Sequence, residues 1–548
     1  MRVGVREEST ANAAPDAPSS GVTDAPATGE RAPAWHLLVA LLVVGALAAG
    51  LVLVLTRNNP AMAPPDSQAY LATADQLRHG HGYTVPFDTV FDARTPAGVA
   101  GSGGRVPLAH WSPALPTAIA ALTPVFGTGL EAARFWNAGL LVAAVVLAGW
   151  IVFRITRSRW RAVVVAAVFG FLPMTLSMYR LVLADAMLIT LMLAVVLATH
   201  VVVERVTPAR LALLTLLALA AATTKHAGVA VAVAAALTVA LLTAGSLWAR
   251  LTRLAVVAVP AVVFEVLWLQ RGDARSLHVH PPGDVDVRAL AQWTGGWFGT
   301  GAPSGLRPLA IVLAVALFAI AAWSAFGHDL PPARRALTIS LGLSAVGVAF
   351  VVVLTRTFVE APVAFNGRNL YAVQAAVLLL VGSVRVGVPA SRPVVVWSVA
   401  GVGAAVALLA VWPWASRDAW QYSFAGPTST VHWVTDPIPS RRTWPVSPVA
   451  ARLPHDASLV SDYPENLWFD VGRGAIQLPP KRDIVADTDD DEFAAHLREV
   501  GRLPAPRYLV LYDCRGNGAL FPTVDEIRAE VPITRVYRDD TSCIFRVR

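Results

Sequence analysis

The chain has 548 residues, of which 55% are hydrophobic and only 15% are charged, and its mean hydropathy is +0.54. This balance excludes an ordinary soluble globular protein, in which about a quarter of the residues are charged. The formal net charge is +7, but the basic residues fall mostly in short connectors between apolar runs, so they indicate membrane orientation rather than nucleic-acid binding. Composition therefore predicts a polytopic protein of a bacterial plasma membrane, in contact with membrane lipids.

Residues 1–34 form a tail rich in Ala, Pro, Thr and Asp, with too few large apolar residues to fold, and we predict that it is disordered. About eleven apolar runs follow, each close to the roughly 20 residues that a bilayer core requires. The first run is interpreted as a retained anchor, because a polar tail precedes it and no small-x-small cleavage site follows. The predicted spans are 35–56, 131–153, 161–179, 181–203, 209–224, 227–246, 252–270, 306–326, 336–355, 369–386 and 394–414.

Arginines in the connectors indicate the orientation. The connectors after the second, fourth, sixth, eighth and tenth spans contain many arginines and only two acids, Glu204 and Asp329. The arginines are Arg154, Arg157, Arg159, Arg161, Arg205, Arg210, Arg250, Arg253, Arg334, Arg335, Arg385 and Arg392. By the positive-inside rule these connectors face the cytoplasm, as does the N-terminus. The transmembrane domain then comprises residues 35–414, and its large first loop, 57–130, lies outside the cell. The C-terminal segment 415–548 follows this domain and is also outside.

The C-terminal segment has the pattern of a separate folded domain. Short apolar runs predict strands, and helical spacing of apolar residues predicts helices between them. A small extracytoplasmic α/β domain is expected. The predicted elements are strands 458–461 and 508–512 and helices 490–500 and 524–531.

The only two cysteines of the chain, Cys514 and Cys543, both fall in this segment. An oxidising exterior permits a disulfide between them, and two buried free thiols are the alternative.

Ionisable side chains near the outer ends of the spans are the candidate site, because charge at a bilayer is costly and usually functional. They come from distant parts of the sequence, yet the predicted orientation brings them to one membrane level, the outer one. They are Asp66 after the first span, Asp185 at the start of the fourth, Lys225 and His226 between the fifth and sixth, Glu265 near the end of the seventh, and Arg356, Glu360 and Arg368 around the connector between the ninth and tenth.

The mixture of acids and cations suits the removal of a sugar from a lipid phosphate. A carboxylate takes the acceptor proton, for which Asp66 is the first choice. Lys225, Arg356 and Arg368 are candidates to hold the departing phosphate charge. Asp185 is expected to bind a sugar hydroxyl or to orient one of these cations.

Three of these residues also have a structural interpretation. Asp66 follows a Pro-Pro pair and is a favoured residue type for capping a helix that begins near Ser67. Arg356 and Arg368 stand at span ends, where arginines extend toward lipid headgroups or pair with an acid such as Glu360.

A metal site is not predicted. His79 and His81 lie in a Gly-rich turn with no third ligand nearby, a pattern more typical of a solvated loop. No cofactor is expected.

Six short motifs, in this order, resemble the GT-C membrane glycosyltransferases, the superfamily that includes protein O-mannosyltransferases and the aminoarabinose transferase acting on lipid A. They are Pro65-Asp66-Ser67-Gln68-Ala69-Tyr70, the turn Gly80-His81-Gly82-Tyr83, the segment His110-Trp111-Ser112-Pro113, Leu183-Ala184-Asp185, Thr224-Lys225-His226 and Gly367-Arg368-Asn369-Leu370. The C-terminal segment also resembles that of bacterial members, in Ser461-Asp462-Tyr463-Pro464-Glu465-Asn466-Leu467-Trp468-Phe469 and Gly472-Arg473.

The resemblance implies a GT-C-like fold and the transfer, with inversion, of a sugar from a polyprenyl-phosphate donor to an acceptor on the external face. The acceptor is an envelope glycan, a lipid or a protein. Asp66 is followed by Ser67, where protein O-mannosyltransferases carry paired acids, and the chain has no Trp-Trp-Asp signature of oligosaccharyltransferases. The residues expected to contact substrate are Tyr70, Tyr83, Trp111, His226 and Glu360.

Two other classes of function were weighed. A transporter or flippase of an envelope precursor also uses charges within the membrane, but inverted repeats are expected of it, and the sequence contains no convincing repeat. The other alternative is a non-catalytic envelope assembly protein. In that case the charged residues at the outer membrane level should be dispensable.

Overall fold

The computed structural model describes residues 34–56, 65–87, 105–108, 111–271, 307–326, 330–358, 368–384, 448–483, 488–512, 521–538 and 542–548. The predicted span 394–414 and nearly all of the predicted tail lie outside the described residues, as do Glu360 and Cys514.

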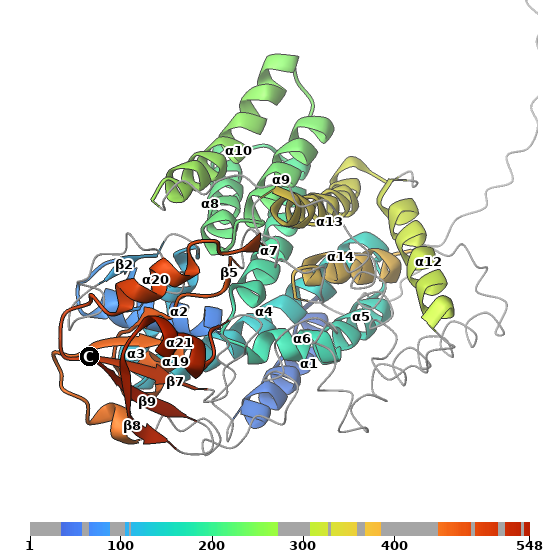
Figure 1. Cartoon of the computed structure of the whole chain (residues 1–548). Coiled ribbons are helices and arrows are strands. Elements are labelled where there is room, and N and C mark those ends of the chain that lie inside the picture. Colours follow the sequence, from blue (N-terminus) through green and yellow to red (C-terminus); the bar gives the residue numbers. More distant parts are fainter. Residues whose placement is uncertain are drawn as a thin grey trace, which may run out of the picture.

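A helical bundle makes up most of the described molecule (Figure 1). Its helices correspond to the apolar runs of the sequence, with ends that differ by a few residues. They are α1 (Ala34–Thr56), α4 (Gly129–Thr156), α5 (Arg159–Phe171), α6 (Pro173–Arg180), α7 (Ala184–Glu204), α8 (Pro208–Thr224), α9 (Gly228–Leu242), α10 (Leu247–Leu269), α12 (Arg307–Phe326), α13 (Pro332–Phe358) and α14 (Tyr371–Gly382).

Within the described residues, five helices are long and apolar enough to cross a membrane, namely α1, α4, α7, α10 and α13. The predicted span 161–179 is broken into α5 and α6, which meet at 56° and count as a sixth span if taken together. Pro173 begins α6 and explains the break, because proline lacks the N–H that a continuous helix needs at this point. The helices support a polytopic membrane protein, whereas the number of about eleven spans stays a prediction.

The outer surface of the bundle is apolar. Helix α10 is the clearest case, since only 22% of its most apolar window is buried within the chain. Large hydrophobic side chains along it are exposed, including Trp248, Val259 and Leu267. Such a surface would be costly in water and matches the interior of a bilayer.

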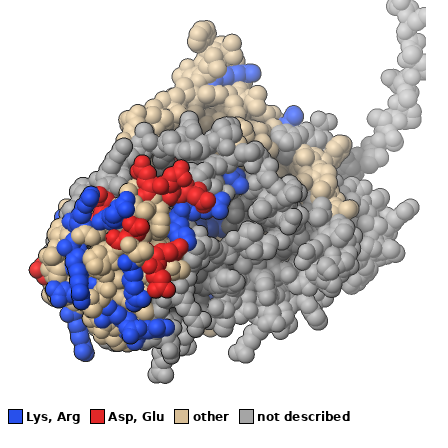
Figure 2. All heavy atoms as spheres, viewed as in Figure 1, with Lys and Arg blue, Asp and Glu red and all other residues tan. Residues whose placement is uncertain are grey.

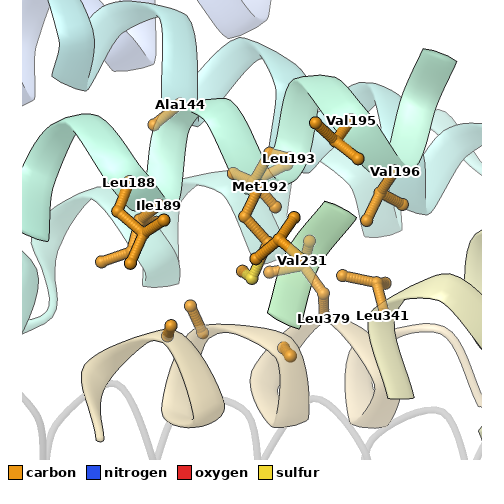
Figure 3. Packing of buried hydrophobic residues seen from close by; sticks show 14 of the residues in the cluster. Ala144, Leu188, Ile189, Met192, Leu193, Val195, Val196, Val231, Leu341 and Leu379 are labelled. Atoms are coloured by element: carbon orange, nitrogen blue, oxygen red, sulfur yellow. The ribbon is translucent and has the colours of Figure 1, made fainter. Parts of the chain in front are cut away.

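Helix α7 is the centre of the bundle. Its apolar side chains are buried on several sides by α4, α9, α13 and α14. Figure 3 shows Met192 and Leu193 of α7 close to Val231 of α9 and to Leu379 of α14. Two thirds of the most apolar window of α7 is buried, so close packing fixes the position of this helix and of Asp185 at its start.

Two helices and a two-stranded sheet lie within the segment predicted as the first external loop. Helix α2 (Pro65–Arg78) begins close to the position expected from Ser67, and α3 (Ala114–Phe126) is an apolar helix that the sequence analysis did not predict. Strands β1 (Thr84–Val85) and β2 (Val106–Pro107) pair in antiparallel fashion. Helix α3 packs against α2 and α4, so this loop is anchored on the bundle.

The C-terminal α/β unit, residues 448–548, contains a five-stranded sheet in the order β4-β3-β7-β9-β8. β3 runs parallel to both β4 and β7, and β9 runs antiparallel to β7 and β8. Its elements are α18 (Pro448–Ala451), β3 (Ser458–Ser461), α19 (Pro464–Val471), β4 (Ile476–Gln477), β5 (Arg482–Asp483), β6 (Thr488–Asp489), α20 (Phe493–Val500), β7 (Arg507–Leu511), α21 (Val524–Glu530), β8 (Ile533–Arg538) and β9 (Cys543–Val547).

The elements expected in this unit are present as β3, β7, α20 and α21. Helix α21 starts with a capping box, in which Thr523 and Glu526 each bond to the other's backbone N–H. Cys543 is disulfide-bonded. Charged side chains gather over this unit, in contrast to the tan surface of the upper helices (Figure 2).

Candidate active site

Four of the predicted residues form one continuous network of charges. Arg368 donates from Nη2 to Asp66 Oδ2 and from Nε to Asp185 Oδ2, the latter over 3.4 Å. Lys225 Nζ donates to Asp185 Oδ1 at 2.6 Å. The order Asp66, Arg368, Asp185, Lys225 thus alternates acid and cation, with two charges of each sign.

The four residues come from four places that the fold brings to the same end of the bundle. Asp66 stands in the first turn of α2, Asp185 in the first turn of α7, Lys225 at the end of α8, and Arg368 just before α14. An acid at a helix start and a cation at a helix end are both favoured by the helix dipole. Asp185 is the most buried, with its side chain 5% exposed.

The turn that carries Lys225 is tight because Gly228 follows it. A Cβ at Gly228 would lie 1.9 Å from the carbonyl oxygen of Ala221. The backbone N–H of Gly228 donates to the carbonyl of Lys225 at 2.7 Å. Only glycine allows α8 and α9 to approach this closely, and this approach directs Lys225 toward Asp185.

Arg368 remains a cation in this network. Burial acts to lower the pKa of its guanidinium, but the charges of Asp66 and Asp185 outweigh burial and hold the pKa above its ordinary value. A guanidinium has five N–H donors and an ammonium three. Arg368 and Lys225 therefore keep donor capacity for an anionic ligand beyond the bonds that they make to the two carboxylates.

Tyr70 lies one helical turn after Asp66, on the same face of α2. Its side chain is buried, and burial together with the charge of Asp66 raises the pKa of its phenol. Tyr70 is therefore neutral and retains its proton.

His226 pairs with a residue of a different helix. Its Nδ1 lies 2.5 Å from Oε1 of Glu265 in α10. The other oxygen, Oε2 of Glu265, is buried and has no hydrogen-bond partner among the described residues. His226 directly follows Lys225 in sequence, so its pairing with Glu265 links α10 to the turn between α8 and α9.

An aromatic cluster adjoins the network. The ring centroids of Tyr83 and Trp268 are 5.6 Å apart, and Phe264 stacks on Trp268 at 5.8 Å. The indole N–H of Trp268 donates to the carbonyl of Trp111 at 3.2 Å. Tyr83 and Trp111 were predicted to contact substrate. Phe264 and Trp268 were missed, although their spacing of four residues in α10 was a visible signal.

The C-terminal unit also reaches the site, through α19. Gln68 Nε2 of α2 donates to Asn466 Oδ1 of α19 at 2.6 Å. In the same helix, the ring centroid of Trp468 lies 6.0 Å from that of Phe87. Glu465, which precedes Asn466, is almost fully buried. The sequence analysis included Glu465 in a motif but gave it no role.

Two further predicted residues are Arg356 and Glu360. Arg356 lies in the last turn of α13, and its role toward phosphate stays a prediction. Glu360 lies outside the described residues. In the described parts of the chain there is no group of three or more His, Cys, Asp or Glu side chains suited to a metal ion.

Of three comparisons with known proteins, the one with solved structures gives matches. No family model matches the chain, and no curated protein matches it in sequence. Among solved structures, the chain is similar to ArnT from Cupriavidus metallidurans bound to undecaprenyl phosphate, with a TM-score of 0.44 and 13% identity, over 94% of this chain and 98% of that chain.

Two further structures are similar to the chain. The Archaeoglobus fulgidus oligosaccharyltransferase has a TM-score of 0.46 at 13% identity, with 87% of this chain and 69% of that chain covered. The arabinofuranosyltransferase AftD from Mycobacteria has a TM-score of 0.48 at 15% identity, over 94% of this chain and 41% of that chain. All three are GT-C glycosyltransferases, the superfamily that the motifs resemble. Because every TM-score is below 0.5, no residue role is inferred from them.

Proposed function

We propose that the chain is a membrane glycosyltransferase, which moves a sugar from a polyprenyl-phosphate donor to an acceptor hydroxyl on the extracytoplasmic face, with inversion at the anomeric carbon. The observation that carries this proposal is the network of Asp66, Arg368, Asp185 and Lys225 at one end of an apolar bundle.

The network has the groups that the reaction requires. The acceptor oxygen forms a bond to the anomeric carbon while the bond from that carbon to the phosphate oxygen breaks, and the electron pair of the broken bond stays on the phosphate. Lys225 and Arg368 stabilise the phosphate charge as it develops. The acceptor proton passes to the carboxylate of Asp66, whose side chain is 28% exposed and so accessible to an acceptor.

Asp185 has a different role from Asp66. It is buried between Lys225 and Arg368 and accepts hydrogen bonds from both. A carboxylate held in this way fixes the two cations at a defined separation, so that they meet the phosphate without further rearrangement. Asp185 thus acts by positioning the cations.

The location of the network suits a lipid-borne donor. Arg154, His200 and Glu204 form a second polar group at the opposite end of α4 and α7. Asp185 and Glu204 lie at the two ends of α7, about 30 Å apart, which is close to the thickness of a bilayer core. The network therefore lies at a membrane surface, where the phosphate of a lipid carrier is found.

The aromatic cluster of Tyr83, Trp111 and Trp268 is proposed to contact the acceptor. Aromatic faces pack well against the apolar faces of sugars, and hydrogen bonds at their edges fix orientation. The hydroxyl of Tyr83 is within 2.8 Å of Thr117 Oγ1.

The test replaces Asp66 with Asn and measures transfer from a radiolabelled polyprenyl-phosphate sugar in membranes that contain the variant. We expect transfer to fall by about 10²–10⁴-fold, because the amide cannot accept the acceptor proton. Asp75→Asn is the matched control, since Asp75 lies on the same helix, is 40% exposed and has its Oδ1 3.5 Å from Nδ1 of the exposed His79.

Wild-type rates of transfer in Asp66→Asn, with the same amount of folded protein in the membrane, would refute the role of Asp66 as base. Failure of the wild-type protein to transfer any sugar from a panel of polyprenyl-phosphate donors would refute the proposed function itself.

A further inference from the structure

Glu465 is a buried acid in a helix that rests on the candidate active site. It stands in the first turn of α19, and the residue is only 5% exposed. The hydrogen bond from Gln68 to Asn466, its neighbour in sequence, attaches this turn to α2 two residues from Asp66. Packing of Trp468 against the clusters that contain Tyr70 and Phe87 holds the helix in place.

The backbone is also close at this junction. A Cβ at Gly474, just after α19, would lie 2.0 Å from the carbonyl oxygen of Pro86 in the first loop. Direct backbone approach of this kind leaves little freedom for α19 to shift on α2. Glu465 is therefore a fixed part of the surroundings of Asp66.

Two acids act on Glu465 from the elements packed against α19. Asp66 does so from α2, and Asp462 from the end of β3. Asp462 is itself held by the backbone N–H of Tyr512, which donates to both of its oxygens at 3.0 and 3.2 Å. Burial first, and then the charges of Asp462 and Asp66, raise the pKa of Glu465 to about 7.

We propose that Glu465 is a positioning residue which the C-terminal unit adds to the active site, and that its ionisation makes Asp66 a stronger base. The inference rests on the proposed function of Asp66. Through Glu465 the C-terminal unit acts on the chemistry by way of Asp66.

The physical reason is repulsion between like charges in a poorly hydrated place. When Glu465 is neutral, Asp66 is ion-paired with Arg368, which favours its ionised form. When Glu465 is ionised, its negative charge disfavours a second carboxylate nearby and so increases the affinity of Asp66 for the acceptor proton. Because the pKa of Glu465 is raised to about 7, the change takes place as pH rises through neutrality.

The activity test compares the pH dependence of sugar transfer in the wild-type chain, Glu465→Gln, Glu465→Asp and Glu492→Gln. We expect wild-type transfer to rise as pH increases through neutrality, and Glu465→Gln to lose that rise and to be about 10-fold slower above it. Glu465→Asp should restore the rise. Glu492→Gln is the control, because its side chain is 80% exposed in the same unit.

A second test needs no activity. Infrared titration of the full chain in detergent, taken as the difference between wild type and Glu465→Gln, follows the carbonyl band of the protonated acid. We expect this band to disappear near pH 7 in the wild type and at lower pH in Asp66→Asn, where the charge of Asp66 is absent.

An identical pH profile in Glu465→Gln and the wild type, or a carbonyl band whose titration Asp66→Asn does not move, would overturn the inference. If the band moves as expected while the wild-type protein transfers no sugar at any pH, the coupling of the two acids stands and the proposed glycosyl transfer fails.

Discussion

Asp185 is the most deeply buried charge of the network, and its environment combines stability with function. It has Lys225 on one oxygen and Arg368 on the other. A buried carboxylate is tolerated only while cations or hydrogen bonds compensate for the lost hydration. Lys225 neutralises Asp185, and we propose that it also contacts the donor phosphate, so a single substitution cannot separate the two roles.

We predict that Lys225→Met destabilises the chain by about 2–3 kcal/mol, less than the 3–5 kcal/mol typical of a broken buried pair because Arg368 still contacts Asp185. The second variant, Lys225→Met with Asp185→Asn, removes both charges and should recover most of the stability. Thermal unfolding in detergent measures both effects.

The same two variants separate stability from catalysis. If Lys225 holds the donor phosphate, the double variant stays inactive although it is stable. Recovery of sugar transfer together with stability would show that Lys225 serves only to neutralise Asp185.

At the scale of elements, the contact between α19 and α2 determines whether the C-terminal unit belongs to the site. It includes a hydrogen bond between side chains, and it is reinforced by the packing of Trp468 against Phe87 and by the close approach of Gly474 to Pro86 in the first loop. The last of these is the most sensitive to substitution, because a backbone carbonyl cannot rotate away as a side chain does.

We predict that Gly474→Ala displaces α19 from α2 and lowers sugar transfer by about 10-fold or more, since misplacement by about 1 Å is costly in a preorganised site. The C-terminal unit should still fold, because the contact lies outside its sheet. Crosslinking between cysteines introduced at Gln68 and Asn466 reports the displacement.

Gly50→Ala is the control for this substitution, because a Cβ at Gly50 in α1 meets no atom within 4 Å. Full activity and unchanged crosslinking in Gly474→Ala would contradict the tight docking of the unit.

At the scale of the whole molecule, polar groups lie at both ends of an apolar bundle. The arginine-rich connectors after α4 and α7 are at the end of Arg154 and Glu204, and the network of Asp66 with the C-terminal unit is at the other. The positive-inside rule predicts that the first end faces the cytoplasm. The proposed donor is used outside the cell, so the proposed function requires this orientation.

Labelling of single cysteines tests the orientation. Val206, which is 38% exposed in the connector between α7 and α8, and Glu492 in the C-terminal unit are each replaced by Cys. A maleimide that does not cross membranes should label Glu492→Cys in spheroplasts, and Val206→Cys only after permeabilisation. Labelling of the unsubstituted chain is the control, because it measures any reaction of the two native cysteines. Labelling of Val206→Cys in intact spheroplasts, with Glu492→Cys labelled only after permeabilisation, would refute the orientation.

The sequence alone predicted most of the elements and assigned the key charges to one membrane level, which stays a prediction. Apolar runs are local signals, so the bundle helices and the strands β3 and β7 were found close to their observed positions. The same runs identified Asp66, Asp185, Lys225 and Arg368 as charges at span ends, because an acid or a cation is conspicuous beside apolar residues.

Only the tertiary structure decided how these residues pair. Arg368 and Asp66 are 302 positions apart in sequence, and which acid an arginine reaches depends on how helices pack rather than on any local pattern. The pairing of His226 with Glu265 and the burial of Glu465 were missed for the same reason. The break between α5 and α6 was also missed, although Pro173 was a local signal for it. Residue type and spacing identify groups that are capable of chemistry, but burial and neighbouring charge determine which of them can exchange a proton near neutral pH.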